Sequence, residues 1–186
     1  LEELAALPAT HADEEARGTF AGWLGRLRYR QGRYLEAAAQ HQNAAEAPLW
    51  LTAKGTALLN AAGAMMDAFR LPEASVLIDA AHDFFVECRH PTSRALATWV
   101  RRTIAYRRGD ELSADSSFAA RIALLGIRDF EGLACLTEAA IAWRTADPEA
   151  GLALSRQAQR AWAAMGENAG GALLAAALAI VCSSSQ

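Results

Sequence analysis

Apolar residues recur along the chain at intervals of three and four positions, in segments separated by short breaks that contain Gly, Pro or Asp. This spacing places the apolar side chains of each segment on one face of an α-helix. Residues 1–7 have the pattern of the tail of one further helix. The pattern predicts helices over residues 13–31, 33–47, 49–69, 72–89, 92–108, 113–125, 129–144, 148–165 and 169–182. Because the breaks are short, neighbouring helices should pack antiparallel.

Residues at the breaks have the chemistry of helix ends. Two prolines suit first helical positions, Pro72 and Pro148. Two polar residues suit N-caps, Ser113 and Asp147. Three glycines suit the position that follows a helix, Gly32, Gly109 and Gly166. These residues support the predicted boundaries independently of the apolar spacing.

Composition agrees with an all-α fold that has a substantial core. Hydrophobic residues make up 53% of the 186 positions, which is enough to exclude a disordered chain. There are only four Val and six Ile, whereas Ala, Leu, Arg and Glu are abundant, so helices are favoured over strands. We therefore expect no sheet.

The breaks also resemble one another. In residues 25–37, Gly, an aromatic residue, a turn Gly, Tyr and Ala follow at the intervals of the tetratricopeptide signature. Six residues match consensus positions, namely Leu24, Gly25, Gly32, Tyr34, Ala37 and Ala44. The small residue after each turn recurs at Ala37, Ala74, Ala114 and Ala150, in steps of 37, 40 and 36 residues. This first unit resembles a tetratricopeptide repeat, and the later units resemble degenerate, longer copies of it.

The resemblance implies an α-α superhelix of about four helix pairs and a terminal helix, in which a groove is lined by the first helix of each pair. We expect residues 1–186 to form one such domain. The chain begins without Met and ends just after an apolar helix, so we also expect it to be a fragment of a longer protein. Degenerate repeats of this length resemble those in the arms of large bacterial signalling ATPases and LuxR-class transcriptional regulators.

An aromatic residue beside an Arg recurs near the end of three first helices. The pairs are Tyr29/Arg30, Tyr106/Arg107 and Trp143/Arg144, with Met66/Asp67 at the fourth position. The resemblance places these pairs, with Arg26 and Trp99, on the concave face, where aromatic rings and guanidinium groups would suit an acidic peptide or ligand. A second interpretation stays open, because aromatic residues at helical spacing also form cores and Arg also forms solvated surfaces.

Candidates for catalysis or metal binding are few. His82, Cys88 and His90 lie close in sequence, but residues 82 and 88 point to different sides of a helix, so we expect no metal site. Phosphate-binding loops, dinucleotide-binding turns and nucleophile elbows are absent from the sequence. We expect neither catalysis nor a cofactor. The chain has one lysine, Lys54, and Arg26 replaces the Asn of the carboxylate clamp of chaperone-binding relatives, which disfavours that ligand.

Two hypotheses for function follow. The first is a non-catalytic module that binds a protein or peptide, as part of a cytoplasmic transcriptional or signalling regulator. The alternative is a small-molecule sensor, in which Trp99, Tyr106 and Trp143 close a pocket and the ligand changes the oligomeric state of the parent protein. A homo-oligomer of the chain is one such state. The net charge of −3 gives no overall attraction to nucleic acid. Three well-separated cysteines and the lack of an export signal or long apolar span favour the cytoplasm and no membrane contact.

Overall fold

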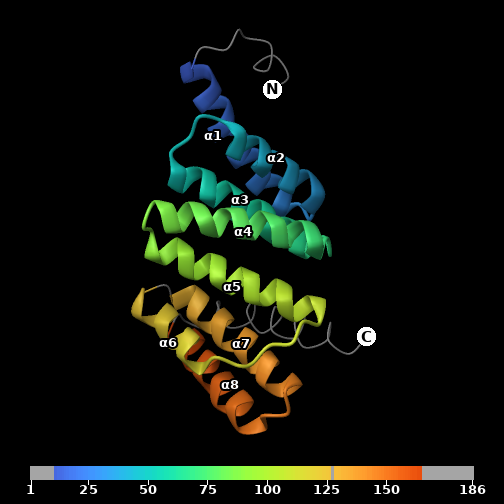
Figure 1. Ribbon diagram of the computed structural model, residues 1–186, viewed down its shortest axis with the longest axis vertical. Coiled ribbons are helices and arrows are strands. Elements are labelled where there is room, and N and C mark those ends of the chain that lie inside the picture. The colour runs from blue at the N-terminus through green and yellow to red at the C-terminus, as the bar shows by residue number, and fades with distance from the viewer. Residues whose placement is uncertain (1–10, 127, 165–186) are drawn as a thin grey trace. The chain divides into compact units, whose positions relative to one another are not determined.

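The computed structural model describes residues 11–126 and 128–164, which form eight α-helices and no strand (Figure 1). The helices are α1 (His11–Arg30), α2 (Tyr34–Glu46), α3 (Leu51–Asp67), α4 (Leu71–Glu87), α5 (Pro91–Arg108), α6 (Ser116–Leu124), α7 (Arg128–Arg144) and α8 (Pro148–Ala163). The prediction of an all-α fold is confirmed for this part of the chain. The predicted helix over residues 169–182, the helix tail over residues 1–7 and the helix end at Gly166 lie outside the described residues.

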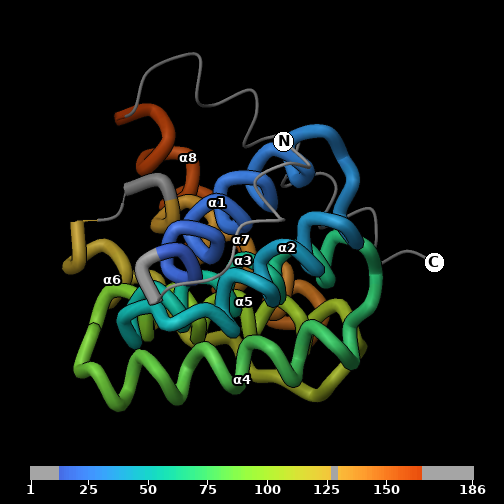
Figure 2. The backbone as a smooth tube through the Cα atoms, turned by 90° about the horizontal axis from the view of Figure 1, so that it is seen from above, coloured from blue at the N-terminus to red at the C-terminus, as the bar shows by residue number. Residues whose placement is uncertain are grey.

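Contacts between Cα atoms divide the chain into two compact units, residues 1–100 and residues 101–186, with the boundary inside α5. In the first unit α1 packs on α2, α2 on α3, and α3 on α4, as Figures 1 and 2 show. In the second unit α7 packs on both α6 and α8. Helices that are adjacent in sequence are thus adjacent in space within each unit. That these units act together as one domain stays a prediction.

Small residues fill the places where helices cross. In the first unit Ala37, Ala38 and Ala64 form one fully buried cluster. In the second unit Gly132 lies under the indole of Trp162, and a Cβ added there would come within 2.0 Å of Trp162 Nε1. Side chains without bulk let helix backbones approach closely. The full burial of Ala37, a small residue that recurs after the predicted turns, agrees with such a close approach.

Five helix ends contain one residue in the left-handed conformation, with positive φ angles at Gly32, Phe69, Arg89, Gly109 and Ala146. In each case the following residue donates its N–H to a carbonyl five residues back, as Arg33 does to Arg28 O at 3.0 Å. This is the Schellman arrangement of helix ends. Four of these residues follow α1, α3, α5 and α7 in steps of 37, 40 and 37 residues, whereas Arg89 follows α4. Only two of the five turns contain glycine.

One predicted helix start is wrong. Helix α6 begins at Ser116 and is capped by Asp115, whose carboxylate accepts the N–H groups of Ser117 and Phe118 at 3.0 and 3.1 Å. The carbonyl of Ser113 instead accepts a hydrogen bond from Arg102 Nη2 at 2.9 Å. The segment up to Asp115 is consequently held as a loop. The predicted N-cap at Asp147 is confirmed, since its side chain accepts from Ala150 N at 3.0 Å.

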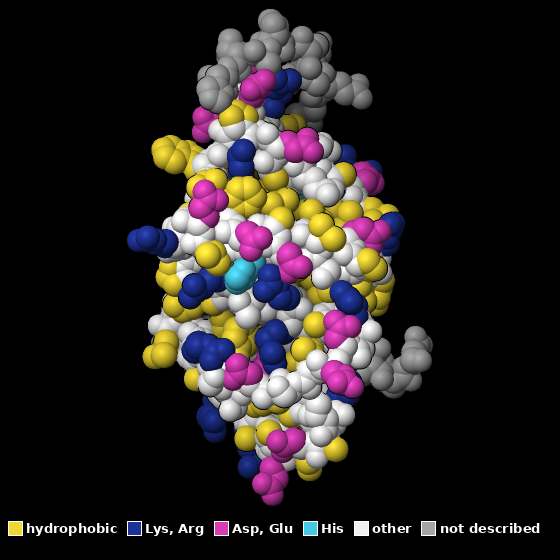
Figure 3. Space-filling view, in the orientation of Figure 1, with side chains coloured by type: hydrophobic (Ala, Val, Ile, Leu, Met, Phe, Trp, Pro, Cys, Tyr) yellow, Lys and Arg dark blue, Asp and Glu magenta, His cyan; other side chains and the backbone are white. Residues whose placement is uncertain are grey.

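Charged side chains of both signs are interspersed on the face drawn in Figure 3, with apolar side chains between them. Several exposed large apolar residues lie on α1, namely Phe20, Trp23, Leu27 and Tyr29. Among the described residues, no helix is long and apolar enough to span a membrane.

Candidate functional site

The first unit contains a solvent-open groove between α1, α2 and α3, with a volume of about 350 Å³. We call it the α1–α3 groove. Helix α1 contributes Gly18, Thr19, Gly22, Trp23 and Arg26. Helix α3 contributes Thr52, Ala53, Thr56, Ala57 and Asn60. His41 and Ala44 of α2 and Leu49 of the following loop complete the lining.

The groove exists because two facing helices carry small residues at helical spacing. On α1 the lining positions recur every three or four residues, which puts them on one face. A Cβ at Gly18 would come within 2.3 Å of Ala47 Cβ, so this glycine permits the close crossing with the α2 end. Gly22 differs, because a Cβ there would meet only Ala44 Cβ at 4.0 Å. Gly22 therefore leaves open space, and that space is part of the groove.

His41 lies at the inner wall and is only 3% exposed. Its ring is packed on Gly25, where an added Cβ would come within 2.7–2.8 Å of three ring atoms. Nδ1 is buried and has no hydrogen-bond partner among the described residues. Burial and, to a smaller extent, the charge of Arg26 together lower the pKa of His41 from 6.5 to about 4. The imidazole is therefore neutral at pH 7.

Trp23 and Arg26 form the outer wall on α1. The Trp23 side chain is 64% exposed, and the guanidinium carbon of Arg26 lies 5.2 Å from the centroid of its ring. At this distance the cation is attracted to the face of the indole. Arg26 is the one charged side chain among the thirteen lining residues, since His41 is neutral. The groove is therefore positively charged at one edge and apolar at its floor.

Of the eight residues predicted to line a groove, Arg26 lines this one. Tyr29 is exposed and lies at the end of α1, where its hydroxyl donates to Asp67 of α3 and its ring contacts the edge of Tyr34 at 5.3 Å. Arg30 is exposed beside it. Trp99 is half-buried on α5. In this unit the structure brings together Arg26, Trp23 and His41, and the aromatic partner of Arg26 is a residue that the sequence analysis did not select.

The remaining four predicted residues lie in the second unit. Tyr106 is 5% exposed and packs with Ala140 and Ile141, so the core interpretation holds for it. Arg144 stacks on Tyr106 at 4.3 Å and donates to the carbonyls of Tyr106 and Asp110 at 2.7 and 2.6 Å. The aligned pair Tyr29–Asp67 spans the same 38 residues as Tyr106–Arg144. These recurring positions thus join one first helix to the next.

The other two of these residues are Trp143 and Arg107. Trp143 is half-exposed, and its indole lies over Gly151 of α8, where an added Cβ would come within 2.8 Å of the ring. Arg107 is half-buried near the end of α5. Neither is among the residues that line the α1–α3 groove.

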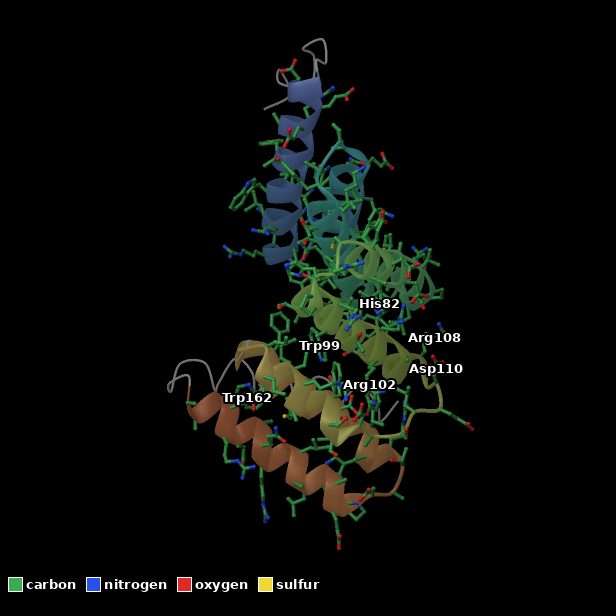
Figure 4. All side chains as sticks on the ribbon, turned by 60° about the vertical axis from the view of Figure 1, so that its left-hand side comes forward. His82, Trp99, Arg102, Arg108, Asp110 and Trp162 are labelled. Atoms are coloured by element: carbon green, nitrogen blue, oxygen red, sulfur yellow. The ribbon has the colours of Figure 1, made fainter. Side chains whose placement is uncertain are left out.

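A fully buried carboxylate organises the second unit. Glu138 of α7 pairs with the guanidinium of Arg102, and Arg102 Nη2 donates to Oε2 at 2.6 Å. Arg102 comes from α5 and is labelled in Figure 4. Glu138 Oε2 also accepts the N–H of Asp115 at 2.7 Å. The Arg102–Glu138 pair joins α5 to α7, and the bonds to Asp115 N and to the Ser113 carbonyl hold the loop before α6 against these helices. Because the fold satisfies this carboxylate, we assign it a structural role.

The His and Cys residues that the sequence analysis weighed are dispersed. His90 accepts the N–H of Ser93 at 3.3 Å, and Cys88 donates weakly to the Phe85 carbonyl at 3.9 Å. Within the described ranges, no group of three or more His, Cys, Asp or Glu side chains could hold a metal ion. Burial raises the pKa of Cys135 to about 12, so this thiol is not a nucleophile at neutral pH.

The sequence contained one signal that could have located the groove. Gly18, Gly22 and Gly25 recur every three or four residues on α1, although glycine is unfavourable inside helices. Such a face indicates a close crossing or open space. The repeat alignment instead directed attention to the ends of the first helices. Comparisons with known protein families, with curated proteins and with solved structures found no match to this chain.

Proposed function

We propose that this chain is a non-catalytic binding module that takes a peptide segment of a partner protein into the α1–α3 groove. The observation that carries the proposal is the groove itself, which is open to solvent, has a volume of about 350 Å³ and combines an apolar floor with polar walls. Ligand sites have this combination of apolar lining and a few polar groups. The open side lets a chain enter and leave along its length.

The polar wall suits a peptide backbone. Thr52, Thr56 and Asn60 lie one turn apart on α3, and Thr56 Oγ1 donates to the carbonyl of Thr52 at 2.7 Å. The hydroxyl of Thr56 therefore retains acceptor capacity, while the amide of Asn60 supplies both donors and an acceptor. A peptide carries both kinds of group at every residue.

The spacing of helix ends supports the same function. Stacked helix pairs of the tetratricopeptide type present extended binding surfaces. The left-handed residues after α1, α3, α5 and α7 recur at intervals that suit such repeats, although Arg89 ends α4 in the same way. On the resemblance in sequence, we propose that the chain is a tetratricopeptide-like arm of a larger cytoplasmic regulator. The alternative of a small-molecule sensor would be favoured by an enclosed pocket, whereas the α1–α3 groove is open. Tyr106, which that hypothesis places in the wall of the sensor pocket, is buried under Arg144.

A pair of glycine substitutions tests the proposal. Gly22→Leu would fill the groove, since a side chain there has open space before it. Gly63→Leu is the matched control, because Gly63 is also inside a helix, also has open space and does not line the groove. Both replacements favour the helix by a similar amount.

The ligand is obtained by selecting peptides from a random seven-residue display library on the full chain. Affinities of the selected peptides are then measured for the wild type and both variants by fluorescence anisotropy. We expect Gly22→Leu to abolish binding and Gly63→Leu to retain it. Equal binding to all three proteins, or no enriched peptide, would refute the proposal.

A further inference from the structure

The lining of the α1–α3 groove carries a positive charge that nothing in the described chain neutralises. Arg26 has no carboxylate within 4 Å among the described residues, and its described contact is the face of Trp23. Other arginines are paired, as Arg33 is with Glu36 and Arg102 with Glu138. The lining contains no Asp or Glu. A ligand that enters the groove therefore meets a cation that is free to form an ion pair.

The second feature is the apolar surface next to this cation. The exposed indole of Trp23 lies directly beneath the guanidinium, and Ala44, Ala53 and Ala57 form the floor behind it. A small inorganic anion would leave this surface in contact with water. A purely apolar ligand would leave the directional donors of Arg26 unused, although these match a carboxylate well.

We propose that the ligand is an acidic peptide segment in which a carboxylate pairs with Arg26 while an adjacent apolar side chain lies against Trp23 and the alanine floor. This inference rests on the proposed function and adds the chemical class of the partner. Arg26 is then the residue that determines specificity. Trp23 has two roles, since it orients the guanidinium and provides apolar contact area at the rim.

The test repeats the peptide selection on the wild type and on Arg26→Glu. We expect wild-type peptides to be enriched in Asp or Glu beside Leu, Phe or Trp, and the Arg26→Glu peptides to be enriched in Lys or Arg. The most enriched acidic peptide is then compared with its form in which Gln or Asn replaces the acid. For the wild type this change should weaken binding about tenfold or more, the size of one charge-assisted hydrogen bond.

A double-mutant cycle separates direct pairing from general attraction. Arg26→Gln should weaken binding of the acidic peptide by the same factor. The affinity of this variant should not change when the acid is replaced, because both changes remove the same interaction. Arg30→Gln is the matched control, since Arg30 is also exposed on α1 but does not line the groove. That variant should bind as the wild type does, and melting temperatures of all variants check the fold.

The two proposals fail in different ways. If the selected peptides are neutral or basic and Gly22→Leu still abolishes their binding, the groove binds peptides but the acidic class is wrong. If additive losses appear in the cycle, or Arg30→Gln weakens binding as much as Arg26→Gln does, pairing with Arg26 is wrong. If no selected peptide is excluded by Gly22→Leu, the proposed function fails and the acidic class fails with it.

Discussion

His41 shows how the packing of one residue couples the groove to the stability of the first unit. The ring is held between α2 and the backbone of α1 at Gly25, and its Nδ1 lacks a partner among the described residues. A buried polar atom without a hydrogen bond destabilises the folded state. This cost is small for a neutral imidazole and would be much larger for a charged imidazolium. The nearby Arg26 adds repulsion to the charged form.

This arrangement predicts a loss of stability in mild acid. The pKa of His41 falls from 6.5 to about 4 on folding, so the unfolded chain binds more protons than the folded chain between these pH values. The contribution of His41 is constant above pH 6.5 and declines as the pH falls toward 4. Between pH 7 and pH 4.5 it should remove about 2–3 kcal/mol of the free energy of unfolding.

Urea unfolding of the wild type and of His41→Gln at both pH values measures this term. Acidic residues contribute to both proteins alike, so the difference between the two profiles isolates His41. The variant should lose less stability than the wild type on acidification. Parallel profiles would show that the imidazole is not kept neutral by the fold.

At the scale of elements, helix ends depend on backbone geometry that the sequence does not display directly. Gly32 and Gly109 were predictable as helix ends, because glycine adopts positive φ without steric cost. Phe69, Arg89 and Ala146 adopt φ angles of 52–58° just after helices and carry no such signal. The hydrogen bonds of the Schellman arrangement and the following helix determine these conformations in the folded chain.

One consequence is a stabilising substitution. Ala146→Gly should raise the free energy of unfolding by about 0.5–1 kcal/mol, because relief of the left-handed conformation exceeds the added entropy of the unfolded chain. Ala153→Gly is the matched control, since Ala153 is exposed inside α8, where glycine should cost about 1 kcal/mol. Thermal or urea unfolding measures both changes. Destabilisation by both would contradict the assigned conformation of residue 146.

The buried pair Arg102–Glu138 predicts a larger effect at the same scale. Arg102→Ala would leave the carboxylate of Glu138 buried without its cation, which typically costs about 3–5 kcal/mol. Arg70→Ala breaks an exposed pair with Glu73, and its effect on stability should be much smaller because solvent screens that pair. Urea unfolding compares the two variants. Similar small losses would mean that Glu138 is satisfied without Arg102.

The start of α6 illustrates why the sequence analysis placed elements well and their exact ends less well. Ser113 and Asp115 are both good N-cap residues, and local chemistry alone does not choose between them. The choice depends on Arg102 and Glu138, which bind the carbonyl of Ser113 and the N–H of Asp115 from two other helices. Contacts between distant segments are not visible in apolar spacing.

The candidate site also depends on contacts between distant segments. The residues aligned across the repeats include two pairs that are 38 residues apart and in contact: Tyr29 donates its hydroxyl to the Asp67 carboxylate, and Arg144 donates to the carbonyl of Tyr106. The alignment did not reveal that these contacts belong to the fold. The groove arises where glycine on α1 leaves space in front of α3, so it breaks the repeat pattern. A site of this kind is found from packing and not from periodicity.

Binding of an acidic peptide in the α1–α3 groove can be tested by a nuclear magnetic resonance titration. Isotope-labelled chain is titrated with the selected acidic peptide, and shifts of backbone amides and of the Trp23 indole N–H are followed. We expect the largest shifts at Trp23, Arg26, His41 and Thr56, and their loss in Gly22→Leu but not in Gly63→Leu. If the peptide binds while the largest shifts fall among residues 101–164, the groove is not the binding site.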